Sequence, residues 1–141
     1  MTTTTTTTNT TPGDIATDPE DEWSEDTNVL EPALPDAVVV LCTAPADDET
    51  GPRLARGMVD AGLVACVNLI PGLRSFYRWR GEVADDQETL LVIKTRAGRV
   101  PELTRWIQEA HPYDVPEVVA LPVTDGARPY LRWVVAESDP G

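Results

Sequence analysis

The spacing of hydrophobic and polar residues predicts alternating strands and helices along most of the chain. The β-branched run at 37–43 is typical of a buried central strand. Apolar residues at helical spacing predict helices at 47–62 and 100–110, and a short closing helix is expected at 129–136. Further strands are expected at 65–70, 88–95 and 115–123.

A long hairpin is expected between the two helices. Pro71–Gly72 interrupts the second strand as a β-bulge would, and the alternation resumes from Leu73 to Val83. Asp85–Asp86 is the expected turn. Such arms extend beyond a small sheet and would expose Phe76, Tyr77 and Trp79, so we expect the chain to form an oligomer.

The predicted order of elements is β-α-β-β-α-β with a terminal helix. This order is that of the α+β ferredoxin-like fold, the split β-α-β sandwich, in which two helices cover one face of an antiparallel sheet. The fold is expected to occupy residues 37–141. Residues 1–36 hold nine acids, no base and eleven threonines, which predicts a disordered acidic tail.

Composition excludes several classes of function. Acidic residues outnumber basic ones 24 to 11, for a net charge of −13, which disfavours binding to nucleic acid or to anionic membranes. The chain shows no bilayer-spanning run and no secretory signal, so a cytoplasmic protein is expected. Its two cysteines are then free thiols. Two cysteines and one histidine are too few for a zinc finger.

Six motifs occur in order at compatible spacing between residues 37 and 136. They are Val39–Pro45, Leu63–Gly72, Ser75–Gly81, Glu88 with Ile93–Thr95, His111–Glu117 and Tyr130–Trp133. Together they closely resemble the CutA family of divalent-cation tolerance proteins. The resemblance implies a cytoplasmic homotrimer of ferredoxin-like protomers, with long hairpins around the three-fold axis, that tolerates and binds copper and other divalent metals without a known reaction.

Cys42 and His111 are the main candidate metal ligands. The family resemblance places copper on the cysteine at position 42 and on histidine beside the His-Pro-Tyr motif, where Ala110 replaces a second histidine found in some members. A thiolate and an imidazole together suit copper. The alternative is structural: His111 closes a helix before Pro112, and Cys42 is a small buried hydrophobe.

Glu88 and Cys66 are weaker candidate ligands. Glu88 shares a strand face with Lys94 and is expected to line a cleft between subunits with Tyr77, Trp79 and His111, although a structural charge pair remains an alternative. Two ligands cannot complete a tetrahedral site, so any metal is expected to bind weakly.

Two classes of function remain open. The leading one is a metal-binding, metal-tolerance protein. The other is a small-ligand-binding or signalling module, because trimers of this fold resemble the PII regulators. A hydrolase resembling acylphosphatase is disfavoured, because the loop at 44–48 is acidic where that class needs an arginine to hold phosphate.

Overall fold

The computed structural model describes residues 36–140. The predicted tail therefore lies, apart from Asp36, outside the described residues. The elements in chain order are β1 (Ala37–Pro45), α2 (Thr50–Asp60), β2 (Cys66–Trp79), β3 (Glu82–Arg96), the 3-10 turn η3 (Ala97–Arg99), α3 (Val100–Ala110), β4 (Val119–Pro122) and α4 (Arg128–Glu137). Within this part of the chain, no helix is long and apolar enough to cross a membrane.

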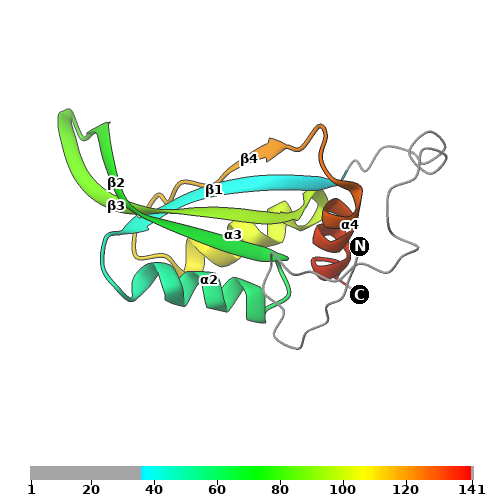
Figure 1. The fold of residues 1–141 in the computed structure, drawn as a ribbon. Coiled ribbons are helices and arrows are strands. Elements are labelled where there is room, and N and C mark those ends of the chain that lie inside the picture. Colours follow the sequence, from blue (N-terminus) through cyan, green and yellow to red (C-terminus); the bar gives the residue numbers. More distant parts are fainter. Residues whose placement is uncertain (1–35, 141) are drawn as a thin grey trace.

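The four strands form one antiparallel sheet in the order β2-β3-β1-β4. Helices α2 and α3 lie against one face of this sheet, while α4 lies at the end opposite the β2–β3 hairpin (Figure 1). This order and layering confirm the predicted ferredoxin-like fold.

The core lies between the sheet and helices α2 and α3. Alternate residues of β1 and β3 point into it, as the two-residue period of a strand requires. Its members are Val38, Val40, Cys42, Ala44, Leu54, Met58, Leu63, Val64, Leu91, Ile93, Leu103 and Ile107.

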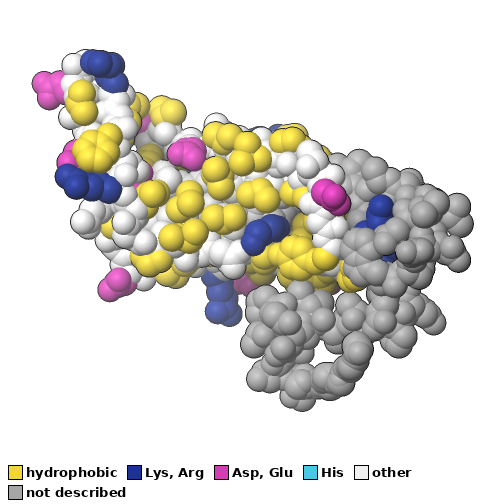
Figure 2. Space-filling model, turned by 45° about the horizontal axis from the view of Figure 1, so that its top comes forward, with side chains coloured by type: hydrophobic (Ala, Val, Ile, Leu, Met, Phe, Trp, Pro, Cys, Tyr) yellow, Lys and Arg dark blue, Asp and Glu magenta, His cyan; other side chains and the backbone are white. Residues whose placement is uncertain are grey.

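The opposite face of the sheet carries a second set of apolar side chains, and α4 packs only against the end of this face, around Ala37 and Cys66. We call it the open face; by strand register it comprises Val39, Leu41, Ile70, Leu90, Val92, Val119 and Leu121. Three of its members are strongly exposed: Ile70 at 49%, Val119 at 46% and Leu121 at 44%. Figure 2 shows hydrophobic side chains spread across one side of the molecule.

The hairpin turn differs from the prediction. Asp85 and Asp86 lie within β3, which begins at Glu82 rather than at residue 88, and the chain turns at Arg80–Gly81. Both turn residues have positive φ, 51° and 84°, as a two-residue type I′ turn requires. The predicted bulge is confirmed: Ile70 pairs with Leu90 and Leu73 pairs with Glu88, so β2 holds one extra residue at Pro71–Gly72.

Other element ends shift by a few residues. Helix α2 begins at Thr50 rather than 47, because the Asp47 side chain accepts hydrogen bonds from the backbone N–H groups of Glu49 and Thr50 ahead of the first turn. The last strand is only Val119–Pro122, shorter than the predicted 115–123. The residues before it, from 111 to 118, form the loop that borders the candidate site.

Candidate functional site

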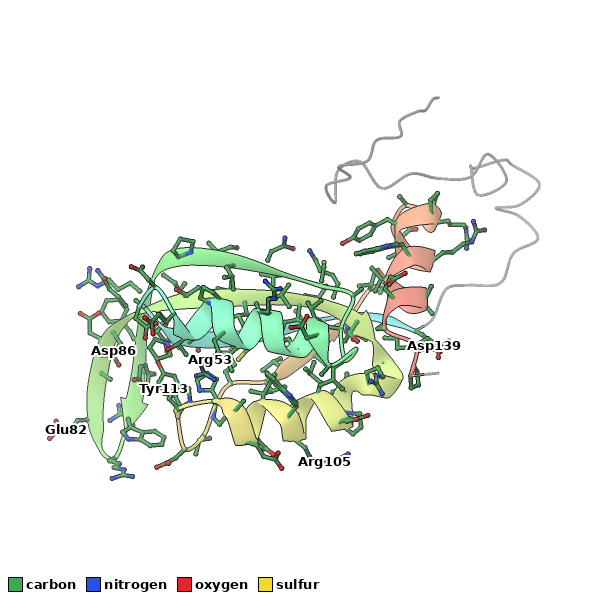
Figure 3. The ribbon with its side chains drawn as sticks, turned by 90° about the horizontal axis from the view of Figure 1, so that it is seen from below. Arg53, Glu82, Asp86, Arg105, Tyr113 and Asp139 are labelled. Carbon is green, nitrogen blue, oxygen red and sulfur yellow. The ribbon has the colours of Figure 1, made fainter. Side chains whose placement is uncertain are left out.

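A cavity of about 660 Å³ lies between the hairpin, from Ser75 to its turn at Arg80, and the loop that follows α3. We call it the hairpin cleft. Its lining residues are Thr43, Ser75, Phe76, Tyr77, Trp79, Arg80, Glu88, Tyr113, Asp114, Val115 and Glu117. Figure 3 shows Tyr113 beside the base of the hairpin, on the same side of the molecule as Asp86. A cavity of this size suits a small molecule.

Glu88 is the fixed polar group of the cleft. It is 5% exposed, and both of its carboxylate oxygens accept hydrogen bonds. The Ser75 hydroxyl donates to Oε1 at 2.7 Å, and the Tyr113 hydroxyl donates to Oε2 at 2.7 Å. Ser75 comes from β2 and Tyr113 from the loop after α3, so the carboxylate joins the hairpin to the body.

The cleft carries negative charge. Three of its lining residues are acids, Glu88, Asp114 and Glu117, against one base, Arg80. Burial, the hydrogen bond to Glu88 and the negative charge of that carboxylate raise the pKa of Tyr113, so its hydroxyl stays a donor at neutral pH. A site of this polarity favours cations over anions.

His111 is buried, and both of its ring nitrogens have partners. The backbone N–H of Tyr113 donates to Nδ1 at 3.1 Å, so Nε2 carries the ring proton and donates to the carbonyl of Thr43 at 2.8 Å. These bonds orient the chain at Tyr113, whose hydroxyl reaches Glu88. A metal ion could bind the imidazole only by displacing one of these bonds.

Cys42 is fully buried on the core face of β1. Its thiol lies 3.7 Å from the Thr43 carbonyl, the same oxygen that accepts from His111. Burial, with the negative charges of Glu117 and Glu88, raises the pKa of Cys42 to about 12. The thiol is therefore protonated at neutral pH, whereas metal binding needs the thiolate.

Cys66 and Lys94 lie toward the other end of the sheet. They pair in register, and the Cys66 thiol lies 3.6 Å from the Tyr130 hydroxyl of α4. Lys94 donates to the side chain of Asn68. Six residues of β3 separate Lys94 from Glu88, roughly 20 Å, so Cys66 cannot reach the hairpin cleft within one chain.

The structure thus brings together only part of the predicted site. Glu88, Tyr77 and Trp79 line a cleft within one chain, whereas the predicted cleft lies between subunits and stays a prediction. The His111 ring accepts a hydrogen bond from the backbone of Tyr113, which lines the cleft, and Lys94 lies elsewhere. Across residues 36–140, no group of three histidine, cysteine or acidic side chains is placed to hold a metal ion.

Sequence reasoning did not single out several of the cleft residues, among them Ser75, Tyr113, Asp114 and Glu117. The last three fall within the motif that begins at His111, and their place in that motif was the available signal.

Comparison with known proteins shows which family the chain resembles. The family model of the CutA1 divalent ion tolerance protein matches residues 38–137. The divalent-cation tolerance protein CutA of Thermus thermophilus is 49% identical over 96 residues, covering 68% of this chain and 92% of that protein. The chloroplastic protein CutA of Arabidopsis thaliana is 47% identical over 98 residues, covering 70% of this chain and 53% of that protein.

Solved structures of CutA proteins are also similar to this chain. The PII-like protein CutA from Nostoc sp. PCC 7120, in its apo form, superposes with a TM-score of 0.66 at 37% identity, covering 72% of this chain and 96% of that one. With a family model that spans the described domain and relatives of this identity, the chain belongs to the CutA1 family of divalent ion tolerance proteins.

Proposed function

We propose that this protein acts as a cytoplasmic homotrimer that supports tolerance of divalent metal ions, copper among them, by binding rather than catalysis. The observation that carries the proposal is the negative hairpin cleft, where Glu88, Asp114 and Glu117 face a single arginine. Its family is one of divalent ion tolerance. Two free cysteines fit a reducing compartment such as the cytoplasm.

The proposed trimer is supported by the open face and by the hairpin. Exposed apolar residues such as Val119 and Leu121 form a broad patch of the kind that marks an interface. Beyond the sheet, Val83 is 69% exposed on a hairpin that projects from the body (Figure 1). A second copy of the chain would bury both surfaces.

We propose Cys42 and His111 as the main metal contacts, with Glu88 and, from a neighbouring subunit, Cys66 as weaker ones. Glu88 faces the cleft with its oxygens already oriented, so it needs the least rearrangement. Cys42 must lose its proton and His111 must release the Thr43 carbonyl or the Tyr113 N–H. These costs predict weak binding that strengthens with pH, and the missing ligands must come from water or a neighbouring subunit.

Metal titration of the full-length chain tests this proposal. Calorimetry with Cu(II), Zn(II) and, under reducing conditions, Cu(I) would compare wild type with Cys42→Ser, His111→Ala and Glu88→Gln. Glu82→Gln is the matched control, because Glu82 is an exposed acid at the far end of the hairpin (Figure 3). Weaker binding in the three variants alone is expected. Equal affinity in all five proteins would rule out these contacts.

A second function is favoured by the size and lining of the cleft. It is large enough for a small organic molecule and has Phe76, Tyr77 and Trp79 among its walls. One structural relative is described as PII-like. We propose ligand binding in the cleft as the alternative function. Ligand titration followed at the Trp79 indole signal would test it.

A further inference from the structure

We propose that the hairpin cleft binds an organic ammonium ion, with its cationic head beside Glu88 and Glu117 and its carbon skeleton against Trp79 and Tyr113. This inference rests on the proposed ligand-binding function of the cleft, and it adds the chemical class of the ligand.

The first argument is an uncompensated buried charge. Glu88 is 5% exposed, yet its hydrogen-bond donors are the neutral hydroxyls of Ser75 and Tyr113. The ion pairs within residues 36–140 involve other carboxylates. A buried carboxylate without a cationic partner is costly, so a cation that enters the cleft gains an unshielded attraction. Glu117 and Asp114 add to it, and the same charges disfavour phosphates and other anions.

The second argument is the position of Arg80. Its guanidinium carbon lies 5.4 Å from the centre of the Trp79 ring, and both residues line the cleft. The protein thus already holds a cation against this indole, by the attraction between a positive charge and the face of an aromatic ring. An organic ammonium ion would use the same attraction and compete with Arg80.

The third argument is the aromatic lining of the cleft, which favours an organic cation over a bare metal ion. The cavity measures about 660 Å³, and its walls include Phe76, Tyr77, Trp79 and Tyr113. Aromatic rings stabilise alkylated ammonium groups, whereas metal ions need several oxygen, nitrogen or sulfur ligands. Within residues 36–140 no group of three histidine, cysteine or acidic side chains is placed to hold a metal ion.

The test uses choline as the probe, 3,3-dimethylbutan-1-ol as its uncharged isostere and ATP as an anionic probe. Calorimetry on the full-length protein would give affinities, and the NMR signal of the Trp79 indole would report occupancy of the cleft. We expect choline to bind about tenfold more tightly than the uncharged isostere. We expect no shift of the Trp79 signal with ATP.

Three variants locate the site. Glu88→Gln should weaken choline binding about tenfold, since it removes the buried charge. Trp79→Leu should weaken it about fivefold, since it removes the ring. Arg80→Asn should strengthen it about threefold, because the competing charge is lost. Asparagine accepts the positive φ of 51° at this turn, so that variant keeps the hairpin. Glu137→Gln, an equal charge change on the exposed surface of α4, at the end opposite the hairpin, should bind like wild type.

Each outcome decides the matter. The expected order of probes and variants supports the inference, and the exposed positions 79 and 80 keep the test valid if Glu88→Gln fails to fold. Equal binding of choline and its isostere, or unchanged binding in Trp79→Leu, overturns it. Binding of ATP in place of choline overturns the ligand class but leaves the cleft as a binding site. If no probe moves the Trp79 signal, the ligand-binding function fails as well.

Discussion

Two tyrosines in this protein make the same hydrogen bond in different surroundings, and they should respond differently to the same change. Tyr113 donates to Glu88, which is 5% exposed, and Tyr77 donates to Asp86 on the exposed hairpin. A hydrogen bond to a buried charge contributes about 1.5 kcal/mol at the lower end of the measured range. Replacing Tyr113 by phenylalanine leaves Glu88 with the Ser75 hydroxyl alone.

Tyr113→Phe should therefore lower the free energy of unfolding by about 1.5 kcal/mol. With an m-value of about 2 kcal/mol/M, the urea midpoint falls by about 0.75 M. Tyr77→Phe is the matched control and should leave the midpoint unchanged, because water replaces an exposed donor. Circular dichroism at one fixed protein concentration measures both. Equal shifts in the two variants would refute the claim that Glu88 depends on its buried donors.

Further predictions concern packing, titration, assembly and the tail. Gly57→Ala should destabilise the protein by about 1 kcal/mol, because the new Cβ would lie 2.8 Å from the Trp106 ring. Thermal melting measures the loss of stability, and adding Trp106→Phe to Gly57→Ala should relieve the clash. The pKa of Cys42 is about 12 in the folded protein, whereas the thiol of the unfolded chain titrates near 9. The free energy of unfolding should therefore be constant below pH 9 and decrease above it, as the unfolded thiol ionises. In denaturant titrations, Cys42→Ala should lose less stability above pH 9 than wild type does. Val119→Asp should convert the proposed trimer to monomers in light scattering, since the charge enters the open face. Deleting residues 1–35 should leave the mass of the proposed trimer and its melting temperature unchanged; a large drop in melting temperature would show that the tail packs.

The sequence predicted the fold well because its signals are local. The alternation of apolar and polar residues in strands and their helical spacing in helices predicted seven elements in the right order. The bulge at Pro71–Gly72 was predicted as well. The predicted position of the hairpin turn was wrong because Asp85–Asp86 is a common turn pair, whereas arginine, found here at Arg80, is uncommon at positive φ. In the structure Asp85 instead pairs with Arg74, and Asp86 accepts from Tyr77.

The site was predicted only in part because its geometry depends on distant residues. Glu88 was found from its strand, but its partner Tyr113 lies 25 residues away in another element. The protonated state of Cys42 depends on Glu117 and on burial in the core, neither of which local spacing reveals. The hydrogen bond between the His111 ring and the Thr43 carbonyl likewise forms only when β1 meets the loop after α3, whereas the bond that the ring accepts from the Tyr113 N–H is local.

The one extra residue at Pro71–Gly72 has a consequence for how this protein can change in length. Beyond it, Ser75, Tyr77 and Trp79 share the face of the hairpin that carries Glu88. Deleting one residue there would rotate the whole outer arm by half a turn and carry these side chains out of the cleft. Insertions or deletions of two residues would keep the faces and only lengthen or shorten the arm. Natural variation in this arm should therefore come in steps of two.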